Sequence, residues 1–140
     1  MAENQRCRSL SFRLVLVYAL LYIVGDMTHI QPKCRATIEE GLALLSSSGG
    51  RRFATLLEHG SLSVELYAPK GIDAQEPHTR DEVYIVARGS GSFLNGDERY
   101  AFGPGDLLFV PAGVIHRFED FSDDLIVWVL FYGPEGGERT

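Results

Sequence analysis

The feature that most constrains this chain is a succession of short segments between Phe53 and Tyr132, each bounded by turn residues. Around position 64 apolar and polar residues alternate, which is the period of a half-buried β-strand. Asn95-Gly96 is a strong hairpin signal, and residues 103–106 form a second glycine- and proline-rich turn. After a strand that includes residues 62–66, strands are expected at 82–88, 92–94, 99–102, 107–110, 116–119 and 125–132. Regular short strands of this kind predict an antiparallel sandwich or barrel.

Two flanking segments behave differently. Thr37 followed by Glu40 is a capping-box pattern, and apolar residues at 38, 42 and 45 recur at helical spacing. Residues 46–50 do not favour continuation, so the sequence predicts a short α-helix of about three turns. Residues 133–138 offer no apolar side chain to bury, and we expect a loop or a frayed end.

The N-terminal segment is an apolar extension. Residues 14–24 form an uninterrupted apolar run of 11, preceded by arginines and followed by Asp26. The run is too short for a spanning helix and lacks small residues at a plausible cleavage point. Residues 1–26 are therefore interpreted as an over-extended start, a signal segment or anchor, or a packed helix, and residues 27–140 as the folded domain.

Composition limits the partners. With 140 residues, 45% of them hydrophobic, one core can hold the fold, so any metal would serve function first. The net charge of −6 opposes binding to nucleic acid or to an anionic membrane surface, so membrane attachment would require a genuine anchor in residues 1–26. Cys7 and Cys34 lie far apart without CxxC spacing, which favours a reducing compartment. We expect a cytoplasmic protein, or an exported one if residues 1–26 are a signal segment.

The residues that carry chemistry lie around two histidines. Gly105, Pro111, Gly113 and His116 follow one another at the spacing of the second motif of the cupin superfamily, with Asp120 in place of its asparagine.

The segment around His78 resembles the first cupin motif. Glu82 and Gly89 fit it, His78 falls on its second histidine and Glu76 on its first, while Gly71 lies one residue too close. The resemblance implies an all-β fold, a double-stranded β-helix or jelly-roll cupin barrel with a short N-terminal α-helix. Among cupins the chain is most similar to small single-domain members without recognised function.

Two imidazoles and a carboxylate form the ligand set of iron, manganese, nickel or zinc with positions left open. We expect His78, Glu82 and His116 to bind a divalent transition metal, with Glu76 as a fourth ligand or base. Gln75 is the runner-up for the fourth position, and Asp81 is a weaker rival to Glu82. Even spacing places Glu76, His78 and Glu82 on one strand face, but it places Arg80 there too. We therefore expect a turn or bulge at residues 79–81, and the placement of Glu76 depends on it. The other interpretation is that both histidines are hydrogen-bonded filler in a barrel that has lost its metal.

Aromatic residues in the strands either line a pocket above the metal or belong to the core. They are Tyr84, Phe109, Phe118, Trp128 and Phe131.

The function that these features favour is a metal-binding small cupin acting on a small organic molecule, as a dioxygenase, isomerase or decarboxylase. The alternative is a non-catalytic module that binds a small molecule in the barrel. No catalytic residue is assigned. Because an unpaired sheet edge is a liability, a homodimer is also expected.

Overall fold

The structure, a computed structural model, describes residues 33–139. The apolar N-terminal extension, its alternative explanations and the predicted boundary at residues 26 and 27 lie outside the described residues. Within residues 33–139, no helix has the length and the apolar character that a bilayer crossing requires.

The described chain consists of one helix followed by eight strands, and each predicted element is confirmed to within a few residues. Helix α2 spans Ile38–Ser47, and its capping box is present, because Thr37 Oγ1 accepts the Glu40 N–H and Glu40 Oε2 accepts the Thr37 N–H. The strands are β1 Phe53–His59, β2 Leu62–Tyr67, β3 Asp81–Arg88, β4 Gly91–Asn95, β5 Glu98–Phe102, β6 Leu107–Val110, β7 His116–Glu119 and β8 Ile126–Tyr132.

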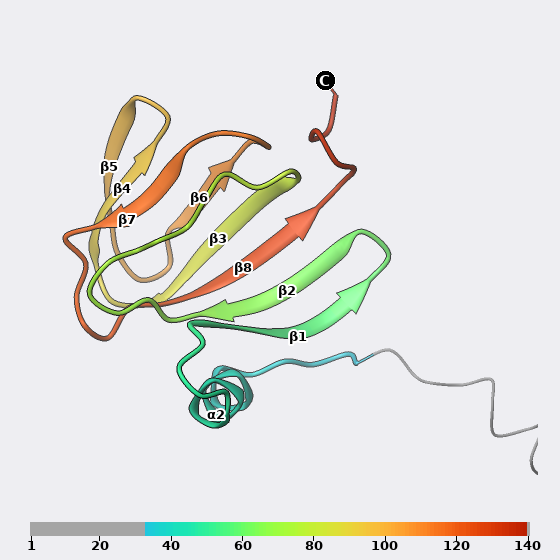
Figure 1. Cartoon of the computed structure of the whole chain (residues 1–140), viewed down its shortest axis with the longest axis vertical. Helices are drawn as coiled ribbons and strands as arrows, with labels where there is room; N and C mark the ends of the chain where they lie inside the picture. Colours follow the sequence, from blue (N-terminus) through green and yellow to red (C-terminus); the bar gives the residue numbers. More distant parts are fainter. Residues whose placement is uncertain (1–32, 140) are drawn as a thin grey trace, which may run out of the picture. The chain divides into compact units, whose positions relative to one another are not determined.

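The strands form two sheets, as Figure 1 shows. The larger has the order β1-β2-β8-β3-β6 and the smaller β5-β4-β7, and all neighbours are antiparallel. β2 and β3 are both neighbours of β8, so the chain crosses from one side of β8 to the other through residues 68–80. This long connection carries much of the candidate site.

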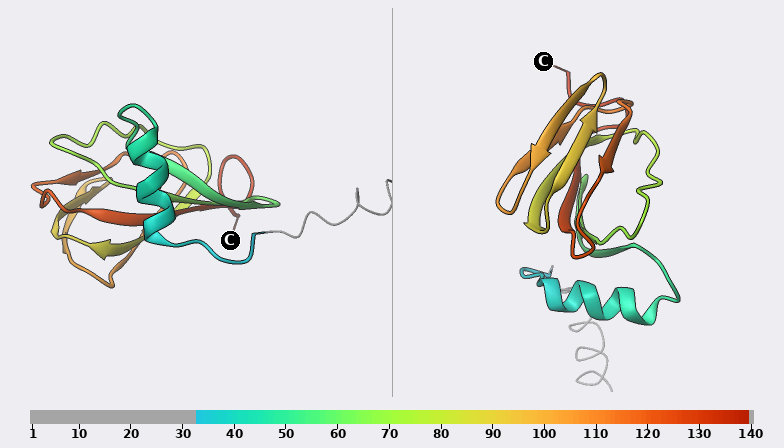
Figure 2. Two further views of the ribbon diagram at one scale, coloured as in Figure 1. Left: turned by 90° about the horizontal axis from the view of Figure 1, so that it is seen from below. Right: turned by 90° about the vertical axis from the view of Figure 1, so that its left-hand side faces the viewer.

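The main core consists of inward side chains from both sheets. It is strongly aromatic, with Tyr84 against Phe93 and Phe118 at ring-centroid distances of 5.6 and 5.0 Å. A second cluster lies on the outer face of the larger sheet, which α2 crosses (Figure 2). There Leu66 is fully buried, and Gly41 of α2 approaches it so closely that an added Cβ would lie 2.5 Å from Leu66 Cδ2.

The C-terminal tail is a loop, as expected, but it is not frayed. The Gly136 N–H donates to the Thr79 carbonyl at 2.6 Å, and the Glu138 N–H donates to Asp81 Oδ2 at 2.8 Å. Hydrogen bonds from backbone N–H groups therefore hold the tail, although it has no apolar side chain to bury.

Candidate metal centre

The structure brings together His78, Glu82 and His116. His78 lies near the end of the long connection, Glu82 is the second residue of β3, and His116 begins β7 in the smaller sheet. Their potential ligand atoms all lie within 4.8 Å of one another. Two sheets and a loop thus converge on one point.

The polar atoms of these side chains lie close together but do not form hydrogen bonds with one another. Glu82 Oε2 lies 3.2 Å from His116 Nε2 and 3.7 Å from His78 Nε2. Both Glu82 oxygens and both Nε2 atoms are buried and have no hydrogen-bond partner among residues 33–139. Burying a polar atom without a partner costs about 1 to 3 kcal/mol, so four of them at one point require an explanation.

The ring of His116 is held in a ligating orientation. Its Nδ1 lies 2.9 Å from the Val114 carbonyl oxygen, which leaves Nε2 with the lone pair directed at Glu82 when Nδ1 carries the proton. Burial by itself lowers the pKa of His116, but the adjacent Glu82 carboxylate and Val114 carbonyl, together with the charge of Asp73, raise it above its ordinary value. The site therefore favours a positive charge beside Glu82, and a cation provides one.

The predicted fourth ligand is not in this group. Glu76 is exposed and lies in the connection before β3, because the strand begins only at Asp81 after a bend at residues 79 and 80. The expected bend is present, but Glu76 lies outside the strand and not on the face of Glu82, so the predicted placement is wrong. The role of Glu76 as a fourth ligand or base stays a prediction.

The two other candidates are engaged elsewhere. Gln75 lies beside the site, yet its Oε1 accepts the Tyr84 hydroxyl at 2.8 Å and its Nε2 donates to Asp73 at 2.9 Å. Asp81 accepts the Ala112 N–H at 2.9 Å and ties the C-terminal tail. The part of the chain that the structure describes therefore offers three ligands.

A residue that sequence reasoning missed organises the connection. Asp73, only 2% exposed, accepts hydrogen bonds from the Tyr67 hydroxyl, the Gln75 backbone and side chain, and the Phe118 N–H. Burial and the Asp73 carboxylate raise the pKa of Tyr67, so its phenol stays protonated and donates. Asp73 thus fixes Gln75 next to the candidate metal ligands His78 and Glu82.

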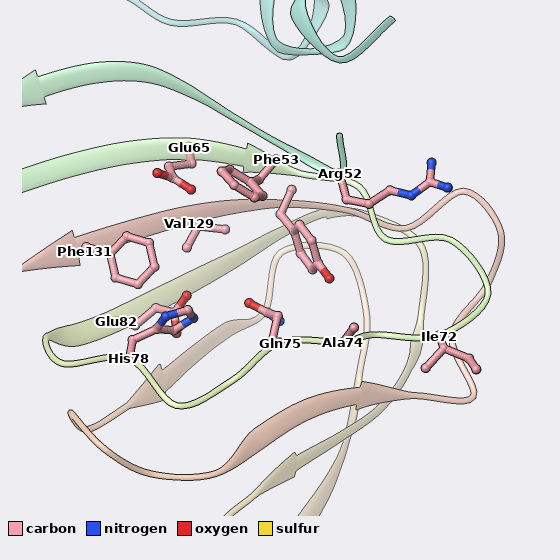
Figure 3. A pocket seen from close by; sticks show the side chains of 11 residues that line it. Arg52, Phe53, Glu65, Ile72, Ala74, Gln75, His78, Glu82, Val129 and Phe131 are labelled. Atoms are coloured by element: carbon pink, nitrogen blue, oxygen red, sulfur yellow. The ribbon is translucent and has the colours of Figure 1, made fainter. Parts of the chain in front are cut away.

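A cavity of about 490 Å³ opens from His78 and Glu82, a volume typical of small-molecule sites. Figure 3 shows its arrangement: Glu65 of β2 lies across from these two residues, Phe131 and Val129 of β8 form the wall, and Arg52 is at the far end. Glu65 occupies a polar position in the alternating segment around residue 64. Since α2 covers the apolar face of β2, the polar face is the one that lines the cavity, which the alternation alone does not show.

The aromatic residues divide between the two roles considered. Phe131 lines the cavity and packs edge-on against His78 at 4.9 Å between ring centroids. Tyr84 and Phe118 are core residues, Trp128 packs beneath α2, and Phe109 is 45% exposed.

Comparison with known proteins identifies the fold. Residues 63–132 match the cupin domain family. An uncharacterized protein of Streptomyces coelicolor is 40% identical over 85 residues, which are 59% of this chain and 81% of that protein.

Solved structures agree. A protein of Ralstonia eutropha, provisionally described as a mannose-6-phosphate isomerase, is 26% identical with a TM-score of 0.51, covering 59% of this chain and 83% of its own. A cupin-2 domain protein of Shewanella frigidimarina has a TM-score of 0.52 at 16% identity, covering 70% of this chain and 94% of its own. The resemblance seen in the two motifs and the predicted all-β fold are thereby confirmed, and the chain belongs to the cupin family.

Proposed function

We propose that this chain binds a divalent transition metal through His78, Glu82 and His116 and uses it to transform a small organic molecule in the adjacent cavity. The observation that carries the proposal is the convergence of four buried, unpartnered polar atoms at one end of that cavity. A cation would satisfy all four at once, whereas a proton between Glu82 and one imidazole would leave the other imidazole unpartnered.

The ligand set and its surroundings suit such a metal. Two imidazole nitrogens, which are borderline ligands, and one carboxylate, which is a hard ligand, form a mixed set that suits iron, manganese, nickel or zinc. Since Glu76 is exposed and both ends of the Gln75 amide are hydrogen-bonded, positions toward the cavity stay open for a substrate.

When bound, such a metal supplies a Lewis acid that polarises a carbonyl, or, if it is redox-active, a centre that activates dioxygen. The chain's own residues do the rest. Phe131 and Val129 exclude water from one side of the cavity. Gln75, which is hydrogen-bonded to Asp73 and Tyr84, provides a polar part of the cavity lining. Burial, followed by the neighbouring Glu82 charge, raises the pKa of Tyr84, which keeps its hydroxyl protonated as the donor to Gln75.

The likeness to the Ralstonia protein supports isomerisation as one candidate reaction, beside dioxygenation and decarboxylation. The cupin fold alone does not select among them, because one fold hosts many chemistries. The identity of the metal decides which reactions to screen.

Metal content tests the proposal. Full-length protein, His116→Ala, Glu82→Gln and the control His59→Ala would be reconstituted with iron, manganese, nickel or zinc, desalted and analysed by elemental mass spectrometry. His59 is exposed on β1, outside the cluster, so its variant controls for histidine loss in general. We expect near-stoichiometric metal in the parent and in His59→Ala, and a large loss in the other two variants.

Absence of all four metals from the reconstituted parent would overturn the metal proposal. The non-catalytic alternative would then lead, because the cavity exists with or without a metal.

A further inference from the structure

The cavity contains a second carboxylate besides that of Glu82. Glu65 belongs to the inner face of β2, and its neighbour across the ladder is Val129 of β8. Glu82 pairs with Phe131 on the other side of β8. The two glutamates therefore flank the apolar strip formed by Val129 and Phe131.

Their separation suits a small molecule. β2 and β3 are both neighbours of β8, so their backbones lie two strand spacings apart, or about 10 Å. A ligand about the size of one ring can lie over Val129 and Phe131, with one end at the metal centre and an edge toward Glu65 (Figure 3).

Glu65 has hydrogen-bonding capacity left for a ligand. Its Oε1 accepts the Thr55 hydroxyl at 3.0 Å, which orients the carboxylate. Its Oε2 has no hydrogen-bond or ion-pair partner within residues 33–139. The other polar side chains of this wall are engaged, since Tyr67 donates to Asp73 and both ends of Gln75 are occupied.

The charge of Glu65 opposes a phosphorylated ligand. A bound divalent metal would offset the charge of Glu82, but the carboxylate of Glu65 would remain, and Arg52 is exposed at the opposite end of the cavity. Desolvation raises the pKa of Glu65, as expected for a carboxyl group in a mainly apolar wall. The charge of Glu82 raises this pKa further, whereas the hydrogen bond from Thr55 lowers it.

We propose that Glu65 accepts a hydrogen bond from an O–H or N–H group of the ligand. The ligands of the cavity are then small molecules with a head group that binds the metal through oxygen, a flat apolar body and a hydrogen-bond donor for Glu65, rather than phosphorylated sugars. This inference rests on the proposed metal function, since the head group is held at His78, Glu82 and His116.

A matched pair of probes isolates the interaction. Benzohydroxamic acid and N-methylbenzohydroxamic acid bind metals through the same two oxygens, but only the first carries an N–H donor. The affinities of both would be measured calorimetrically for the metal-loaded full-length protein, Glu65→Leu, Glu65→Gln and the control Glu58→Leu. Glu58 is exposed on β1, so its variant removes the same charge away from the cavity.

We expect the parent and Glu58→Leu to prefer the N–H probe, and Glu65→Leu to lose about tenfold of that preference, the usual value of a hydrogen bond to a charged group. Glu65→Gln, which keeps an acceptor, should be intermediate and guards against misfolding of the leucine variant. The same preference in the parent and both Glu65 variants, with metal and probe bound, would overturn the inference and leave the metal proposal intact. Mannose 6-phosphate binding the parent more tightly than benzohydroxamic acid would overturn the ligand class, whereas a parent without metal would overturn the proposed function itself.

Discussion

Asp73 accepts the backbone N–H of Phe118 at 2.8 Å, although the two residues are 45 positions apart in the sequence. Phe118 lies in β7 two residues after His116, and Asp73 lies in the connection five residues before His78. This hydrogen bond therefore joins the two segments that supply the histidines. Their spacing depends on a residue that lies outside the cluster itself.

Asp73→Asn should weaken both stability and metal binding. Whichever way the new amide is oriented, its NH₂ group faces a backbone or side-chain donor that in the parent donates to a carboxylate oxygen of Asp73. We expect a loss of roughly 2 to 3 kcal/mol in the free energy of unfolding, measured in denaturant, and weaker metal binding by calorimetry. Asp106→Asn is the control, because Asp106 accepts the Gly103 N–H in an exposed turn. Equal losses in the two variants would contradict the role assigned to Asp73.

Glu65 should make stability depend on pH. Its folded-state pKa is raised from 4.5, chiefly by desolvation, so the folded protein holds this proton more tightly than the unfolded chain. The contribution of this group to stability is therefore present at low pH and is lost as the pH rises from about 4.5 through the raised value.

Glu65→Gln removes that dependence. In metal-free protein, the stability of the variant relative to the parent should rise across this pH window and then level off, as measured by denaturant unfolding from about pH 4 to about pH 8. The groups that act on Glu65 are Thr55, Glu58, His78 and Glu82, and all of them are retained in the variant. If the difference in unfolding free energy between the parent and Glu65→Gln is constant over this range, the raised pKa of Glu65 is refuted.

Gly41→Ala should destabilise the protein even though alanine favours helices. The new Cβ would lie 2.5 Å from Leu66 Cδ2 and 2.8 Å from Leu66 Cβ, and Leu66 is fully buried against Leu56 and Ile126. Overpacking of about 1 to 3 kcal/mol outweighs a gain in helix propensity of about 1 kcal/mol. The matched variant Gly103→Ala, whose Cβ meets nothing within 4 Å, should be near neutral or slightly stabilising. Thermal unfolding of both variants tests this prediction. A Gly41→Ala variant that is more stable than the parent would contradict it and would show that the helix can shift away from Leu66.

The expected homodimer stays a prediction with a definite surface. β6 is an edge strand of the larger sheet, and its Leu107 and Phe109 are 63% and 45% exposed. Sedimentation equilibrium should give twice the chain mass for the parent and for Leu44→Glu on exposed α2, and a single chain for Leu107→Glu. A monomeric parent would refute the dimer.

The strands and the helix were predictable because their signals are local. Alternation and the turns at residues 95–96 and 103–106 define the strands, and the pair Thr37 and Glu40 defines the start of α2. The convergence of His78, Glu82 and His116 was predictable because the two motifs fix their spacing and place Glu82 and His116 at the starts of strands.

The failures have a common physical origin. Glu76 was misplaced because the path of residues 68–80 follows no period and depends on tertiary hydrogen bonds. Asp73 was missed because three of its partners, the Tyr67 hydroxyl, the Gln75 amide and the Phe118 N–H, come together only in the folded protein. Glu65 was missed because alternation distinguishes two faces of a strand without showing that both are covered.

Consecutive residues of β2 therefore serve opposite sides of one sheet: Leu66 packs beneath α2, and Glu65 faces the cavity. The substitutions that preserve folding and those that alter ligand preference fall on alternate positions of the same strand. Evolution can thus change substrate preference through the inward residues of β2 while its outward residues keep the protein folded. This is one physical route by which a single small fold acquires different functions.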